Sequence, residues 1–116
     1  MHPKSPRLLE DVARSCRYIA DDTADATLES YLSRRQMRQA VERNLEIIGE
    51  ALNRLRMVDP DTAAAITDVQ RIIGLRNRLA HDYDDEIDDA LVWRAVHDSL
   101  PVLQADVERI LPPFES

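Results

Sequence analysis

A cation, an imidazole and a phenol lie close together in this sequence. Arg76 and His81 are separated by four residues, and Tyr83 follows two positions later. A guanidinium is a permanent cation that hydrogen-bonds phosphate oxygens, and histidine exchanges protons near neutral pH. Together these two groups could bind a phosphate ester and carry a proton to or from it. The hydroxyl of Tyr83 could reach the same cleft as Arg76 and His81.

Arg76 is unusual because of where it falls in the pattern around it. We predict a helix over 69–81 whose apolar face should also contain position 76; that face is formed by Val69, Ile72, Ile73, Leu79 and Ala80. A cation on such a face is costly unless it meets an anion or a solvated cleft. Arg76 therefore indicates an anion site.

The end of this helix decides whether the imidazole can join the guanidinium. In a continuous helix, positions 76 and 81 diverge by about 140°. We expect the helix to end at Ala80 or His81, so that unwinding brings the imidazole back beside Arg76. The residues alone leave an alternative open: Arg76 bridges two helices through an acid such as Glu50, His81 caps the helix, and Tyr83 packs at an edge.

Two further helices are expected before this segment. The first begins near Pro6 with Ser5 as its N-cap, ends near 21–22 and leads through a polar linker to a short helical turn around Leu28. The second, capped by Ser33 and stopped at 59–60, has the clearest stripe, at steps of three and four: Met37, Val41, Leu45, Ile48, Leu52 and Leu55.

The remaining boundaries also follow from local signals. Thr67 and Gln70 predict a capping box that opens the 69–81 helix. The last helix should begin near 88–89 and reach Leu111, with a kink or break at Pro101, which has no amide to donate to a preceding carbonyl. Outside the proposed site, we expect Cys16 to be buried, His97 to lie at the surface and Trp93 to pack in the core or an interface.

The composition indicates one all-α domain over residues 1–116, with an ordered core of about 5–111. The chain has 116 residues, two glycines, one cysteine and a single phenylalanine. Antiparallel sheets need frequent turn glycines, so a helical bundle with an aliphatic core is favoured. Neither a secretory signal nor a membrane-spanning run is evident, so a cytoplasmic location is expected.

The charge is distributed unevenly. The formal net charge is −7, yet residues 34–56 carry a local +3, residues 69–81 another +3, and residues 82–98 a local −6. Binding of a phosphate chain depends on the local potential, so the acidic total does not exclude RNA. We expect no DNA partner and no cofactor. We also expect no metal, because His2, His81 and His97 form no ligand cluster.

Several of these segments resemble one known family. The run Arg76-Asn77-Arg78-Leu79-Ala80-His81-Asp82-Tyr83 resembles the Arg-x4-His-x-Tyr signature of HepT-like toxins, a branch of the HEPN superfamily. Residues 41–51 look like the family's long helix, and residues 87–96 are similar to the segment that follows its signature. The likeness spans about residues 5–111.

The resemblance implies a fold, a reaction and a partner. It implies an up-and-down HEPN bundle of four to five helices that forms a homodimer or higher even oligomer, with a cleft at the two-fold axis. It implies metal-independent cleavage of RNA as the toxin of a toxin–antitoxin pair, with His81 as general base or acid, Arg76 as phosphate clamp and Asn77 as orienting residue. The implied antitoxin is an MntA-type nucleotidyltransferase that transfers AMP to Tyr83.

Two other functions remain open on the sequence. The chain could be a non-catalytic companion subunit that presents nucleotide or substrate to a nucleotidyltransferase, with a cleft that binds an anion without cleaving it. It could also be a purely structural helical dimer, in which alanine at position 76 or 81 changes only stability.

Overall fold

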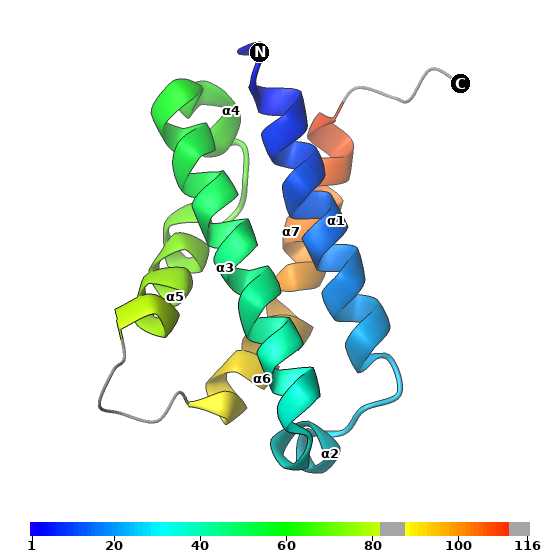
Figure 1. The fold of residues 1–116 in the computed structure, drawn as a ribbon. Coiled ribbons are helices and arrows are strands. Elements are labelled where there is room, and N and C mark those ends of the chain that lie inside the picture. Colours follow the sequence, from blue (N-terminus) through cyan, green and yellow to red (C-terminus); the bar gives the residue numbers. More distant parts are fainter. Residues whose placement is uncertain (82–87, 112–116) are drawn as a thin grey trace.

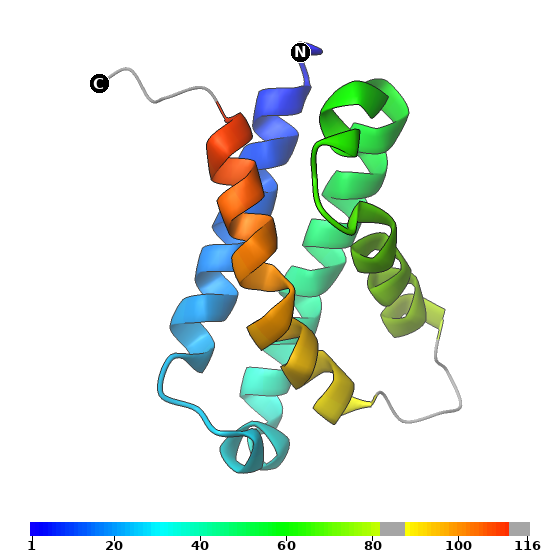
Figure 2. The same cartoon turned by 180° about the vertical axis from the view of Figure 1, so that it is seen from behind.

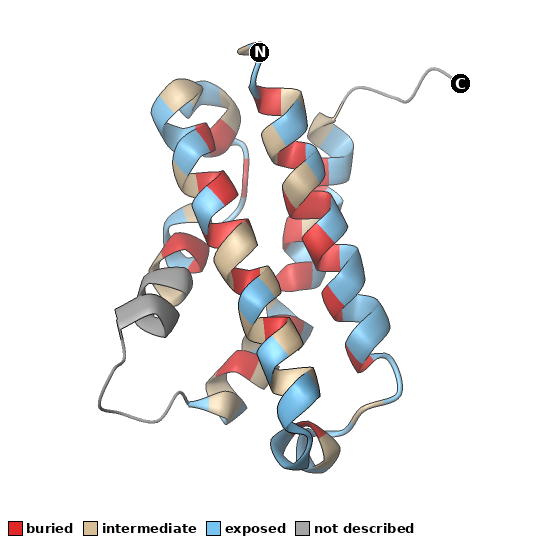
Figure 3. Ribbon diagram, viewed as in Figure 1, coloured by how far each residue is buried: buried red, intermediate tan, exposed pale blue. Residues whose placement is uncertain are grey.

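The two helices with the strongest apolar stripes form the centre of the fold. In the computed structural model, α1 (Ser5–Thr23) packs along α3 (Arg35–Val58) (Figure 1). The structure describes the backbone of residues 1–81 and 88–111, and the side chains of these residues except 76–81. Buried residues recur along both helices (Figure 3), among them Leu9, Val12, Cys16 and Ile19 on α1, and Val41, Leu45, Ile48, Leu52 and Leu55 on α3.

The other helices pack around this pair. Figure 2 shows α7 (Leu100–Ile110) lying against α1, and α5 (Val69–His81) beside α3. Helix α6 (Asp89–Asp98) leads into α7, while α2 (Leu28–Ser33) and α4 (Pro60–Ala64) are short connecting turns. The described residues contain no strand, which confirms the all-α class. None of the described helices is long and apolar enough to cross a bilayer.

The last helix is interrupted just before Pro101, as predicted. Helix α6 ends at Asp98, Ser99 separates the two helices, and Pro101 lies in the first turn of α7, where its missing amide costs no hydrogen bond. Helix α7 packs against α1, and its residues Leu100 and Leu103 are buried in the core.

Three predicted helix caps are wrong, because each side chain or amide has another partner. The hydroxyl of Ser5 donates to Asp59 Oδ2 at 2.7 Å, and Lys4 occupies the N-cap of α1 without a side-chain cap. Ser33 is the last residue of α2, so its hydroxyl donates to the Ser30 carbonyl and Arg34 is the N-cap of α3. The Thr67 amide donates to Asp106 in place of a capping box.

The side chains that we set outside the site occupy the expected environments. Cys16 is buried, and burial raises the pKa of its thiol to about 12. His97 is exposed, and its Nδ1 lies 2.9 Å from the Trp93 carbonyl oxygen. Trp93 is half-buried against the core, with its ring centroid 5.2 Å from that of Tyr31. These three residues are accounted for by packing.

Candidate active site

Helix α5 carries three of the four residues assigned to the site. The backbones of Arg76, Asn77 and His81 lie in its last turns, and the helix ends at His81, one of the two predicted end points. Positions 76 and 81 are about 7.5 Å apart along the helix axis. The three side chains and the whole of Tyr83 lie outside the described residues. The approach of the imidazole to the guanidinium therefore stays a prediction, as does the alternative pairing of Arg76 with Glu50.

The start of α5 is fixed by contacts with two other helices. The Thr67 amide donates to the buried carboxylate of Asp106 on α7 at 2.9 Å, and Arg109 holds the same carboxylate at 3.0 Å. The hydrogen bond from the Thr67 amide is the main reason that the pKa of Asp106 is lowered. On the other side, Arg56 of α3 donates to the Gln70 side chain at 3.3 Å. These contacts anchor the helix that bears the signature.

The middle of α5 packs on α3 through its predicted apolar face. Ile72 and Ile73 are buried in the core, and Val69 and Leu75 pack against its edge. The exposed side chain of Arg71 lies off this face. The core thus holds α5 up to the turn in which position 76 begins the signature.

An apolar pocket separates α5 from α6. It has a volume of about 290 Å³, with Leu45 of α3, Ile72 and Leu75 of α5, and Leu91 and Ala95 of α6 among its lining residues. Gly74 also lines it, and nothing lies within 4 Å of the position that a Cβ would occupy there. The pocket therefore opens beside α5 within one turn of position 76, and its lining suits apolar groups.

A polar cluster holds the start of α6 against α3. Asp88 caps α6 by accepting from the Leu91 amide, and the neighbouring Asp89 Oδ2 lies 3.5 Å from Arg38 Nε. Burial and the neighbouring Asp89 carboxylate raise the pKa of Glu42. The other oxygen of Asp89 is buried and has no partner among the described residues.

Sequence reasoning missed this cluster. Glu42 and Asp89 are separated by 46 residues, and no short motif connects them. The available signal was that Glu42 precedes the buried Leu45 by three residues on the long helix, where an acid is less expected than on an exposed face. The cluster holds the start of α6, at Asp88 and Asp89, in the segment that follows the signature.

Comparison with known proteins assigns the family. The model of the family described as "Ribonuclease HepT-like" matches residues 9–110, which is most of the chain. The chain belongs to the HepT-like family. This match confirms the family resemblance, and the all-α bundle agrees with the HEPN-type fold expected of HepT-like proteins.

Relatives of this HepT-like chain come from several organisms. It is 33% identical over 102 residues to "Putative RNase MJ1380" of Methanocaldococcus jannaschii, covering 86% of this chain and 90% of that protein. It is 27% identical to "Putative RNase TTE0752" of Caldanaerobacter subterraneus, covering 93% and 96%, and 28% identical to "Probable ribonuclease HepT" of Thermococcus cleftensis, covering 88% and 91%. No solved structure gives a significant match.

Proposed function

We propose that this HepT-like protein is a metal-independent endoribonuclease and the toxin of a toxin–antitoxin pair. The observation that carries the proposal is the Arg-x4-His-x-Tyr signature at the end of α5 in a chain that matches the ribonuclease HepT-like family along residues 9–110. Relatives named as RNases support RNA as the substrate.

The residue chemistry supplies a complete reaction without a metal ion. His81 accepts the proton of an RNA 2′-hydroxyl, whose oxygen forms a bond to the adjacent phosphorus. Arg76 stabilises the negative charge that develops on the phosphoryl oxygens, and Asn77 orients the phosphate. The bond from phosphorus to the 5′-oxygen then breaks, and that oxygen takes a proton from an imidazolium. The products are a 2′,3′-cyclic phosphate and a free 5′-hydroxyl.

A homodimer would supply both proton-transfer groups. One imidazole acts as base while the His81 of a second copy, already protonated, acts as acid. The apolar pocket between α5 and α6 supports an interface on this side, because the half-buried Leu75 and Leu91 line it beside the signature helix. Burial of such a surface against a second copy would bring two signature helices to one cleft.

The proposed antitoxin is a nucleotidyltransferase that modifies Tyr83. The Tyr83 oxygen attacks the α-phosphorus of ATP, the bond between the α- and β-phosphates breaks, pyrophosphate leaves and the phenol proton passes to a base or solvent. The attached AMP would place a phosphate near Arg76 and fill the space that RNA requires. RNA cleavage would then stop without dissociation of the dimer.

Cleavage and growth assays test the nuclease. Purified wild-type protein should cut RNA in the presence of EDTA, and its expression should arrest growth. Arg76→Ala and His81→Ala should each lower cleavage by at least about 100-fold, the usual size of a lost proton-transfer or charge-stabilising group. Arg43→Ala and His97→Ala are the matched controls, because among the described residues Arg43 pairs with Glu46 and His97 contacts Trp93. Both controls should cut at the wild-type rate.

The same assays separate the proposal from its alternative. Intact RNA after incubation with a wild-type protein that binds it would favour the companion-subunit function. Mixing Arg76→Ala with His81→Ala chains should restore part of the activity if two copies share the cleft.

Co-expression with the nucleotidyltransferase tests the modification. An AMP-sized mass should appear on the Tyr83 peptide and be absent from the peptide of Tyr18, which is 52% exposed on α1. A Tyr83→Phe protein that still acquires AMP would contradict the assignment.

A further inference from the structure

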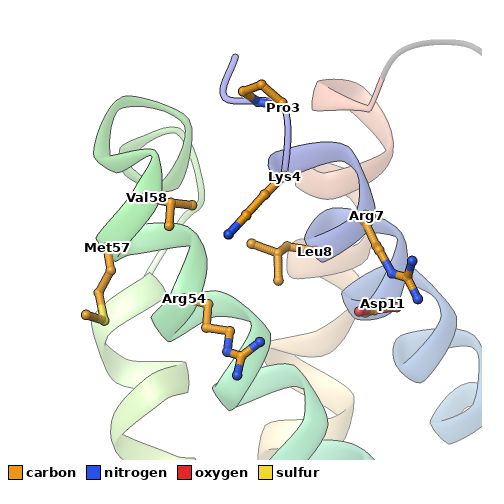
Figure 4. Close-up of a pocket in the computed structure, with 8 residues that line it drawn as sticks. All are labelled: Pro3, Lys4, Arg7, Leu8, Asp11, Arg54, Met57 and Val58. Atoms are coloured by element: carbon orange, nitrogen blue, oxygen red, sulfur yellow. The ribbon is translucent and has the colours of Figure 1, made fainter.

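An open groove lies between the first turns of α1 and the last turns of α3, away from the end of α5 that bears the signature. Its volume is about 770 Å³. Figure 4 shows Lys4 and Leu8 extending from the α1 side towards α3, and Arg54 extending from α3. Met57, which is 73% exposed, and Val58 complete an apolar lining on the α3 side. The groove therefore combines cations with an aliphatic surface.

The cations of the groove lack carboxylate partners. Lys4, Arg7 and Arg54 have no carboxylate oxygen within 4.0 Å in the part of the chain that the structure describes, as is also true of most of the other described arginines; four arginines do, at 2.6–3.5 Å. The one acid in the lining, Asp11, is already paired with Arg14 at 2.6 Å. In a chain of net charge −7, the groove therefore brings three cations without carboxylate partners to one surface.

Further exposed arginines lie on the side of α3 that faces the signature helix. Arg56 is two residues after Arg54 on α3, so it points about 200° away from Arg54 around the helix. It donates to neutral partners, Asn53 at 2.7 Å and Gln70 at 3.3 Å. Gln70 lies in the first turn of α5, and the exposed Arg71 follows it. From Arg71, α5 runs about 15 Å to His81. Cations spread over this distance and over two sides of α3 fit a chain of several anions better than a single anionic group.

We propose that this groove binds single-stranded RNA that extends beyond the cleavage site, and this inference rests on the proposed ribonuclease function. Lys4, Arg7 and Arg54 neutralise phosphates of the strand, and Leu8, Met57 and Val58 contact the faces of its bases. The groove supplies affinity for longer RNA and takes no part in bond cleavage. A neighbouring pocket shares Leu8, Asp11 and Arg54 with the groove and adds Glu50, so we place the strand at the end that Lys4 lines.

Salt-dependent binding tests the groove. The variant Lys4→Gln/Arg7→Gln/Arg54→Gln removes three cations, and Arg17→Gln/Arg34→Gln/Arg35→Gln is the charge-matched control from exposed positions outside the groove. Both are made in full-length protein that also carries His81→Ala, and binding of a labelled 20-nucleotide single-stranded RNA is measured by anisotropy from 50 to 200 mM salt. Loss of three phosphate contacts should reduce the slope of log K against log salt by about two, since each contact contributes about 0.7 for single strands. The control should change the slope by much less.

A second measurement keeps this inference separable from the nuclease proposal. With His81 restored, the groove variant should cleave a trinucleotide that contains the wild-type cleavage sequence at the wild-type kcat/KM, and cleave the 20-nucleotide RNA with a raised KM. Wild-type cleavage together with an unchanged salt slope in the groove variant would overturn the groove assignment alone. An unchanged slope with weakened binding of the nucleotidyltransferase would assign the groove to that protein partner instead. If the wild type neither binds nor cleaves RNA, both proposals fail.

Discussion

Replacing Glu42 with glutamine should stabilise the protein at neutral and alkaline pH. Burial and the Asp89 carboxylate raise the pKa of Glu42, and Oδ1 of Asp89 is buried without a donor among the described residues. Two neighbouring carboxylates repel each other when both are ionised, and only a protonated Glu42 can donate a hydrogen bond to Asp89. The glutamine amide carries donor hydrogens at every pH, so Glu42→Gln supplies the missing hydrogen bond permanently.

The sign and size of the effect follow from this geometry. Burial and Asp89 raise the pKa of Glu42 in the folded protein above its unfolded value of about 4.3. The folded state then binds more protons than the unfolded state. Glu42 therefore makes its full contribution to the free energy of unfolding below its unfolded pKa, and this contribution is lost as pH rises through the folded pKa. Satisfying one buried acceptor is worth about 1–3 kcal/mol, and partial exposure of Asp89 places the gain near the lower value. For this size of chain, about 1 kcal/mol corresponds to roughly 4 °C in Tm.

Urea and thermal unfolding of wild type and Glu42→Gln between pH 4 and pH 8 measure this gain. The two proteins should have nearly equal stability at pH 4, and the variant should become increasingly more stable towards pH 8. Glu10→Gln is the control, because Glu10 is exposed on α1 and is not among the charges that shift the pKa of Glu42. A Glu42→Gln protein that is less stable than wild type at pH 8, or whose advantage does not depend on pH, would refute the shared-proton reasoning.

Three further changes test other parts of the fold. Tyr31→Phe should leave stability unchanged or raise it by up to about 1 kcal/mol, because the buried hydroxyl has no partner among the described residues, and a larger loss in urea unfolding would reveal one. Asp106→Ala should lower the free energy of unfolding by about 1–3 kcal/mol, because it leaves the Thr67 amide unpaired. Asp106→Asn keeps an acceptor oxygen and should cost less. Faster hydrogen exchange of the amides at the start of α5 would report the lost hydrogen bond. The lowered pKa of Asp106 means that its contribution is present above its unfolded pKa of about 3.9 and is lost as pH falls. Cys16, whose thiol pKa is raised to about 12, should resist a thiol reagent at pH 8 until the protein unfolds, and rapid labelling of the native state would contradict its burial.

Local features of the sequence predicted most of the helical architecture. The long stripe ending at Leu55 is buried along α3, and the chain changes direction before Pro101 because a proline lacks the amide that a continuous helix needs. The end of α5 at His81 was also among the predicted end points. Each of these features depends on residues only a few positions apart.

The helix caps were harder to predict because several donors compete for one acceptor. Ser5 has the residue type of an N-cap, yet its hydroxyl binds Asp59, which also accepts from the amide of His2 and the hydroxyl of Thr62. These hydrogen bonds, with the His2 amide contributing most, lower the pKa of Asp59 and join the N-terminus to the end of α3. A local pattern cannot show that a stronger, charged acceptor 54 residues away will take the hydroxyl.

Local patterns are enough to specify the helical class, the register of the two central helices and the signature Arg76, His81 and Tyr83, because periodicity and short spacing are properties of neighbouring residues. The approach of Glu42 to Asp89, and the groove that Lys4 and Arg7 share with Arg54, depend on how the helices pack. Those groups come from helices that are distant in the chain, and their distances are set by how the apolar faces of α1, α3 and α6 pack. Packing is a property of the whole core, so no segment of the sequence could supply it alone.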